Sequence, residues 1–213
     1  MRTYVSHLEG TFVAAILTLD RAHLFSDGIV ILNHPSYLKK KVSDQFSKVH
    51  KINPHCAILT YGRYLPDLVT TASNRIDEAD DLDTIKARFN SIFEELWDRA
   101  PKDGVKTGAI IVCFDKKRVP CSFVMESTSI PPFHPGPIHC PTASEPITIG
   151  AVCHDEGRYA SCQRLIAELQ KLIGRGFRPT HETFRAAFDN VKKELSLLSD
   201  EIGGNTFELI LKP

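Results

Sequence analysis

The period of the apolar residues changes several times along this 213-residue chain, and the order of those changes limits the possible folds. Helical periods come in two pairs, and each pair lies between groups of short apolar or β-branched runs. This order indicates an α+β fold in which sheets stack face to face and helix pairs cover the outside. We expect strands at 11–18, 22–31, 46–51, 55–60, 107–114, 121–126, 147–149 and 206–211, and helices at 66–76, 83–99, 155–173 and 180–198.

The composition is that of one globular domain, with 42% hydrophobic and 24% charged residues. Lys and Arg together number 26, and so do Asp and Glu, so the chain lacks the basic excess of a dedicated nucleic-acid binder. No run of 18 apolar residues predicts a transmembrane helix, and the opening MRTYVSHLEG lacks the apolar core of a secretory signal. We therefore expect a cytoplasmic protein that binds neither nucleic acid nor membrane.

The cysteines are scattered and form no CxxC pair, which favours reduced thiols in a chain long enough to need no disulfides. They stand at positions 56, 113, 121, 140, 153 and 162. One group of metal-binding residue types, His134, His139, Cys140, Cys153 and His154, has a spacing that fits no standard zinc pattern. We expect neither a metal nor a cofactor.

Three polar residues stand at the ends or in the middle of expected strands. Thr11 follows Gly10 at the head of the first strand, Asp27 ends the apolar segment LFSDG, and Lys48 lies within the third strand. Each has an ordinary explanation, namely β-propensity, a turn and a solvated strand face. Together, a hydroxyl, a carboxylate and an amine could converge on one rim of a sheet.

The order of these residues resembles that of proteasome β-subunits and the bacterial proteasome-like protease, which are N-terminal-nucleophile hydrolases. In that family a short propeptide ends in Gly before a Thr, as Gly10 precedes Thr11 here. The acidic residue of the family follows its Thr by sixteen positions, as Asp27 does, and its lysine precedes a segment like Ile-Asn-Pro, as Lys48 does. Gly62 matches the glycine whose amide binds the oxyanion in that family, and the resemblance spans nearly the whole chain.

This resemblance implies a four-layer αββα sandwich of the N-terminal-nucleophile hydrolase type, with a possible propeptide at 1–10 and a single domain at 11–213. It implies a threonine-type endopeptidase that processes itself between Gly10 and Thr11. The freed Thr11 amine would be the base for its own hydroxyl, Lys48 and Asp27 would pair beside it, and the Gly62 N–H would stabilise the oxyanion.

The resemblance also implies a substrate pocket and partners. The pocket would be lined by Phe46, His50, Thr60 and Tyr64. Tyr64 replaces a small side chain of the family, so it would either fill the pocket or swing out onto the neighbouring helix. Family members form ring oligomers with an inner chamber, act on peptides or unfolded proteins, and usually work with a gating or unfolding partner.

Several departures favour a different function. Ala151 replaces a Ser beside the nucleophile's amine, and Ser199 and Ile202 replace an Asp and a Ser, with Asp200 a substitute only if the backbone shifts by one residue. The first alternative is therefore a catalytically inactive, proteasome-like structural subunit. The second is a small-molecule amidase of the same fold that uses another nucleophile, for which Thr3 is a candidate.

Overall fold

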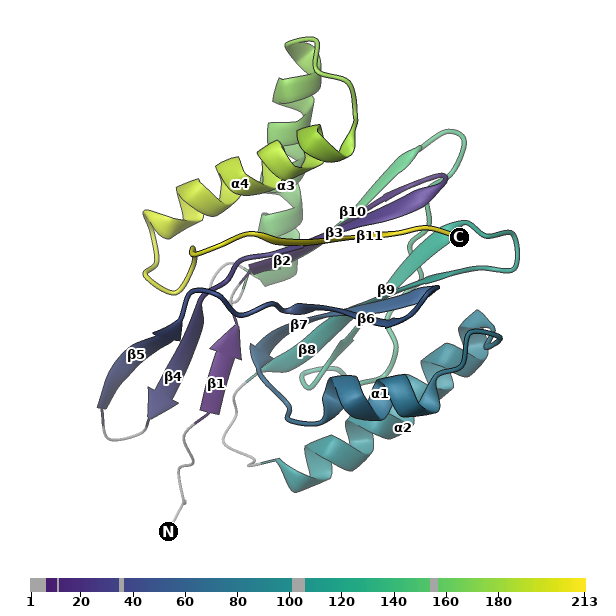
Figure 1. Ribbon diagram of the computed structural model, residues 1–213, viewed down its shortest axis with the longest axis vertical. Coiled ribbons are helices and arrows are strands. Elements are labelled where there is room, and N and C mark those ends of the chain that lie inside the picture. Colours follow the sequence, from purple (N-terminus) through teal and green to yellow (C-terminus); the bar gives the residue numbers. More distant parts are fainter. Residues whose placement is uncertain (1–6, 11, 35–36, 101–105, 154–156) are drawn as a thin grey trace.

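The computed structural model of the protein describes residues 7–10, 12–34, 37–100, 106–153 and 157–213, and within them eleven strands and four helices (Figure 1). The strands are β1 (His7–Gly10), β2 (Phe12–Thr18), β3 (Arg21–Ser26), β4 (Val30–His34), β5 (Tyr37–Ser43), β6 (Val49–Asn53), β7 (Cys56–Arg63), β8 (Thr107–Phe114), β9 (Pro120–Glu126), β10 (Ile147–Cys153) and β11 (Phe207–Leu211). The helices are α1 (Leu68–Arg75), α2 (Leu82–Arg99), α3 (Gly157–Gly174) and α4 (His181–Ser196).

The strands form two antiparallel sheets. The larger runs in the order β5-β4-β1-β7-β8-β9, with β6 also paired to β7, and the smaller runs β10-β2-β3-β11. One edge of β7 is shared: β6 pairs along Cys56–Leu59, and β1 pairs at Gly62 and Arg63. Two antiparallel sheets with helices that are separate from them in the chain order confirm the α+β class expected from the sequence.

Three apolar clusters hold the elements together. Helix α2 places Phe89 and Phe93 on the larger sheet, and helix α4 places Phe188 against Phe12 of β2, with the two rings stacked 4.6 Å apart. Between the sheets, Val13 of β2 belongs to one cluster with Leu59 of β7. Strand β2 is therefore buried on both faces, which explains why its sequence is a continuous apolar run without polar alternation.

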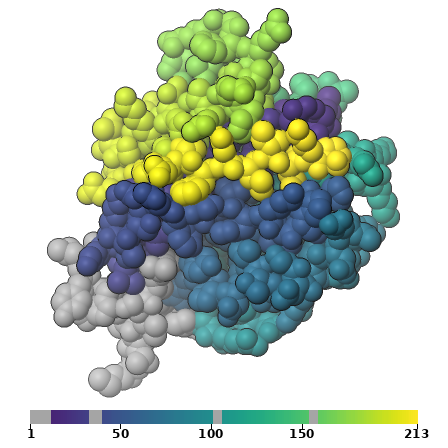
Figure 2. All heavy atoms as spheres, in the orientation of Figure 1, coloured from purple at the N-terminus to yellow at the C-terminus, as the bar shows by residue number. Residues whose placement is uncertain are grey.

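The helix ends follow from local sequence signals. Asp81 caps α2 by accepting a hydrogen bond from the Thr84 backbone N–H at 3.0 Å, and the Thr180 side chain caps α4 by accepting from the Thr183 N–H. In the space-filling view, the yellow strand β11 lies across the visible face between helix α4 and the blue segment that contains β6 (Figure 2). None of the helices in the described part of the chain is long and apolar enough to cross a membrane.

The expected hairpins 11–18/22–31 and 46–51/55–60 correspond to the antiparallel pairs β2–β3 and β6–β7. The single strand expected at 22–31 is wrong, because β3 ends at Ser26 and β4, which begins at Val30, joins the other sheet. Strands β1 and β5 were not expected, and β10 extends four residues beyond the predicted end at Ile149.

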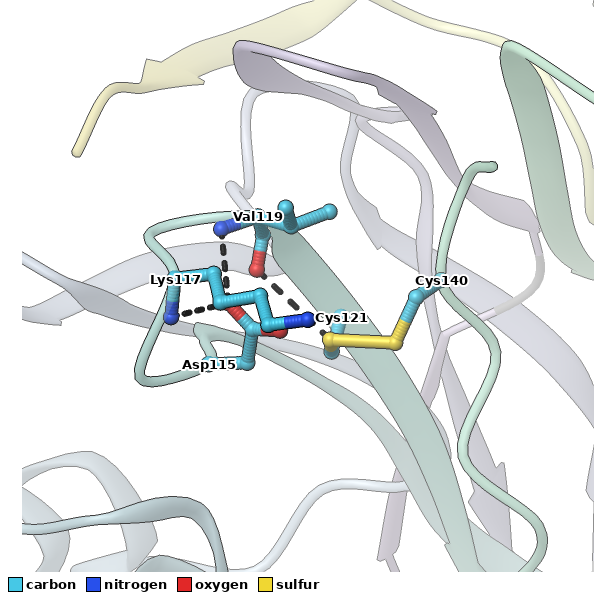
Figure 3. The surroundings of a disulfide bond; sticks show 5 residues. All are labelled: Asp115, Lys117, Val119, Cys121 and Cys140. Carbon is cyan, nitrogen blue, oxygen red and sulfur yellow. Dashed lines mark hydrogen bonds between the residues drawn. A yellow bond between two sulfur atoms is a disulfide. The ribbon is translucent and has the colours of Figure 1, made fainter. Parts of the chain in front are cut away.

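The expectation of reduced thiols is wrong for two cysteines. Cys121 of β9 and Cys140 form a disulfide with Cα atoms 4.5 Å apart, next to the β8–β9 turn that Asp115 stabilises (Figure 3). The proline-rich segment 130–146 is thereby fixed along β9. His139 also exchanges two backbone hydrogen bonds of 2.8 Å with Ser122. In the part of the chain that is described, no three His, Cys, Asp or Glu side chains form a group suited to a metal ion.

Candidate active site

Lys48 and Asp27 form an ion pair in the interior of the molecule. Asp27 follows the last residue of β3 and is fully buried, and Lys48 precedes the first residue of β6 and is 1% exposed. The Lys48 ammonium donates to Asp27 Oδ1, and the Lys48 backbone N–H donates to the hydroxyl of Ser26 at 3.3 Å. Two charges are kept out of water only where they are paired, so the pairing expected from the sequence has a structural counterpart.

The Asp27 carboxylate also joins three backbone segments. Its Oδ1 accepts the N–H of Phe12 at 3.0 Å, and its Oδ2 accepts the N–H of Gly203 at 3.3 Å and that of Ile29 at 3.4 Å. The Asp27 N–H in turn donates to the Phe12 carbonyl at 3.0 Å. The ion pair is thus attached to the first described residue of β2. Thr11, the predicted nucleophile, precedes Phe12 and lies outside the described residues, as does the alternative candidate Thr3.

Burial sets the electrostatics of Lys48. Loss of hydration lowers the pKa of its ammonium below the ordinary 10.5, and the attraction and hydrogen bond of Asp27 partly offset that effect. An amine whose charged form is less stable than in water can exchange a proton with a neighbouring group more readily than a surface lysine can.

Gly62 lies near the end of β7 in a left-handed conformation. Its φ is 67°, and a Cβ at this position would lie 2.2 Å from the Lys106 carbonyl oxygen, so only glycine fits. Gly10, the residue before Thr11, pairs with Gly62 across the β1–β7 ladder. The residue before the predicted scissile bond therefore lies opposite the glycine that is predicted to bind the oxyanion.

The four predicted pocket residues differ in their burial. Thr60 is buried, and the rings of Phe46 and Tyr64 meet edge to face with centroids 5.3 Å apart. Tyr64 thus contacts a residue expected to line the same pocket. The Nε2 atom of His50 is buried without a hydrogen-bond partner among the described residues, and burial lowers the pKa of this imidazole.

The departures from the family pattern have structural consequences of their own. Ala151 pairs with Ala14 in the β10–β2 ladder, whereas Cys153 pairs with Phe12. The prediction that Ala151 lies beside the predicted nucleophile is therefore wrong. Its partner on β2 is Ala14, which comes three residues after position 11 in the sequence. Position 154, which follows Cys153 and also belonged to the histidine and cysteine group, lies outside the described residues.

The segment before the Gly-Gly pair does not supply the expected polar groups. Ile202 is buried in the apolar cluster under α3 and α4, and Asp200 is exposed. The Ser199 hydroxyl accepts a hydrogen bond from the Glu201 N–H at 3.3 Å. This segment does contact the site, because the Gly203 N–H donates to Asp27. This hydrogen bond was not predicted, although the Gly203-Gly204 pair is a signal in the sequence that could have located it.

Comparisons with known proteins identify solved structures of similar fold but no sequence family. No family model matches the chain, and no curated protein matches it. The fold is similar to the crystal structure of eukaryotic HslV from Trypanosoma brucei, with a TM-score of 0.54 and 14% sequence identity over 95% of this chain and 100% of that chain. At this identity the similarity concerns the fold alone.

Proposed function

We propose that the protein is a threonine-type endopeptidase of the proteasome-like group, with the four-layer αββα sandwich of the N-terminal-nucleophile hydrolases. The observation that carries the proposal is the buried Asp27–Lys48 ion pair, which is hydrogen-bonded to the backbone of Phe12, directly after Thr11. HslV is a protease of the same proteasome-like group, so the structural similarity points in the same direction as the sequence.

The first reaction is removal of residues 1–10. The Thr11 hydroxyl loses its proton to a base, and its oxygen attacks the carbonyl carbon of Gly10. The C–N bond to Thr11 breaks, and the nitrogen takes up a proton to become a free amine. Water then hydrolyses the resulting ester, so that residues 1–10 leave with a carboxylate and the domain 11–213 begins with Thr11.

In later turnovers the freed amine is the base for the Thr11 hydroxyl. Lys48, charged and paired with Asp27, favours the deprotonated oxygen and the neutral amine through its positive potential. The Gly62 N–H stabilises the oxyanion of the tetrahedral intermediate, a contribution of about 3–4 kcal/mol for one donor in comparable sites. Phe46, His50, Thr60 and Tyr64 line the pocket for the residue before the scissile bond.

The proposal extends to assembly and location. Copies of the chain associate into a ring whose chamber holds the active sites, in the cytoplasm, and a gating or unfolding partner delivers peptides or unfolded proteins. The two cleavage reactions themselves use only groups of the chain and water.

A second candidate function, a catalytically inactive subunit of such a ring, is favoured by two observations. Strand β1 is a paired member of the larger sheet, held between β4 and β7, so residues 7–10 contribute to the fold. Ile202 is buried in an apolar cluster where the family pattern has a serine. A chain that keeps β1 permanently would have no free amine at Thr11.

The intact mass of the purified chain distinguishes the two functions. We expect the wild-type chain to begin at Thr11 and the Thr11→Ala variant to keep residues 1–10. Thr70→Ala, which changes an exposed threonine on α1, is the matched control and should be processed like the wild type. If the wild type and both variants all retain the ten residues, the peptidase proposal is wrong and the inactive subunit is favoured.

A further inference from the structure

His50 of β6 carries a buried polar atom that has no partner in the described part of the chain. Its Nε2 atom is shielded from solvent and makes no hydrogen bond there. The same burial lowers the pKa of the imidazole below its ordinary value of 6.5, so the ring is neutral at pH 7. Buried polar atoms are nearly always hydrogen-bonded in folded proteins, so this nitrogen is a candidate for binding something outside the chain.

The strand register places a second polar side chain next to this imidazole. His50 pairs with Ile58 across the β6–β7 ladder, and the Thr60 N–H donates to the Lys48 carbonyl at 2.9 Å. Because residues two apart on a strand share a face, His50 and Thr60 lie on the same face of the sheet as diagonal neighbours. Ile58, on that face, belongs to the apolar cluster under α1 and α2, and α1 contacts β6. The two polar side chains therefore lie on the face that the first helix pair covers.

Two aromatic side chains complete the set of predicted pocket residues. The rings of Phe46 and Tyr64 meet edge to face with centroids 5.3 Å apart. Such a ring pair offers an apolar surface against which methylene groups can pack. A pocket built from these rings together with His50 and Thr60 would be apolar on one wall and hydrogen-bonding on another.

We propose that His50 determines specificity by hydrogen bonding to a neutral polar side chain, glutamine above all, in the residue before the scissile bond. The methylene groups of that side chain pack on the rings of Phe46 and Tyr64. Its terminal amide bonds to the Nε2 atom of His50 and to the hydroxyl of Thr60. The inference rests on the proposed function, which supplies the scissile bond and assigns these four residues to the pocket.

An amide suits this site better than the other side chains of similar length. It has both donors and an acceptor, so it can satisfy the imidazole in either tautomer. A carboxylate would give up its hydration beside an imidazole that is itself uncharged. A methionine side chain would fill the same length but leave the His50 nitrogen without a hydrogen bond. Peptides with Gln, Glu or Met at this position therefore separate hydrogen bonding from charge and from size.

Replacing His50 with Leu tests the structural premise without requiring catalysis. Because the change removes a buried polar atom that has no partner, we expect Tm to rise by roughly 2–6 °C. His55→Leu, at a half-buried position in the turn between β6 and β7, is the matched control and should not raise Tm. A lower Tm for His50→Leu would mean that the imidazole already has a stabilising partner in the free chain, and it would overturn the inference.

Three peptides that differ only in the residue before the scissile bond test the selection itself. At about pH 7.5, where the imidazole is neutral, we expect the processed wild type to cleave the Gln peptide at least about tenfold faster in kcat/KM than the Met or the Glu peptide. In His50→Leu the Gln and Met peptides should reverse their order. His50→Gln, which keeps a hydrogen-bonding group, should retain the preference for Gln, and His55→Leu should match the wild type.

The outcomes separate this inference from the proposed function. Equal cleavage of the three peptides by the wild type, or a preference for Met or Glu, overturns the inference and leaves the peptidase in place. A chain that cleaves none of the peptides and retains residues 1–10 overturns the proposed function, and the inference with it.

Discussion

At the scale of single residues, the Asp27–Lys48 pair is notable because burying two charges requires a large desolvation free energy, which apolar side chains of similar volume would not. Both side chains are removed from water, and the desolvation of a buried pair commonly cancels or exceeds the attraction between its charges. The carboxylate has three further backbone N–H donors, so its position is fixed by the chain on three sides. Such a pair adds little net stability, and it agrees with the chemistry that we propose at residue 11.

Replacing Lys48 with Met should destabilise the fold, because it leaves a buried carboxylate without its counterion. We expect the free energy of unfolding to fall by about 3–5 kcal/mol, measured by urea denaturation. The double variant Lys48→Met/Asp27→Asn should recover part of this loss. Lys51→Met, at an exposed position of β6, is the matched control and should change little. A neutral or stabilising effect of Lys48→Met would contradict the assignment of a tightly coupled pair.

At the scale of elements, a pair of histidines connects β3 to the start of α4. The Nδ1 atoms of His23 and His181 lie 2.9 Å apart, and the Nε2 of His181 contacts Glu208 of β11 at 3.1 Å. His23 is 3% exposed, and its ring meets that of Phe184 edge to face. Burial, together with the charges of His181 and Arg21, lowers the pKa of His23 from 6.5 to about 4.

This contact should make stability depend on pH below neutrality. Between pH 6.5 and about 4 the unfolded chain binds a proton at His23 and the folded chain does not, so stability rises with pH across this window. The difference in pKa corresponds to about 3 kcal/mol, present in full above pH 6.5 and lost as the pH falls to 4. Urea denaturation of His23→Phe should show a flatter pH dependence than the wild type, and an unchanged pH dependence would contradict this prediction.

At the scale of the whole molecule, net charge and exposed apolar residues bear on the self-association that we propose. Its formal net charge is zero, which weakens self-repulsion between copies. Directly after the last residue of α4, Leu197 and Leu198 are 81% and 71% exposed. Apolar residues in this position agree with the association into rings that we propose.

Light scattering coupled to sizing chromatography should therefore give a particle many times 23.8 kDa. The double variant Leu197→Asp/Leu198→Asp should shift the protein toward smaller species, because charges at a subunit contact oppose its burial. Lys193→Asp, an exposed change in the last turn of α4, is the control. A wild-type protein that elutes as a monomer would count against both the active and the inactive ring subunit.

Much of this organisation could be predicted where the residues that decide it are close in sequence. The four- and three-residue spacing of Ile85, Phe89 and Ile92 defines the face that α2 buries, and Asp81 marks its beginning through a local hydrogen bond. In the same way, the sixteen-residue interval from Thr11 to Asp27 spans a single hairpin, so the carboxylate returns to the start of β2.

Other features depended on partners that are distant in sequence, and only the tertiary structure decided them. Nothing local specifies that Glu9 and Gly10 lie between β4 and β7, because any strand edge with open N–H and C=O groups can accept them. The pairing of Cys121 with Cys140 likewise could not be chosen among six cysteines from spacing alone. Periodicity determines which face of an element is buried. The partner of that element, whether a strand edge, a cysteine or a charged side chain, lies far away in the sequence. It is determined by the packing of the whole chain, which local periodicity does not specify.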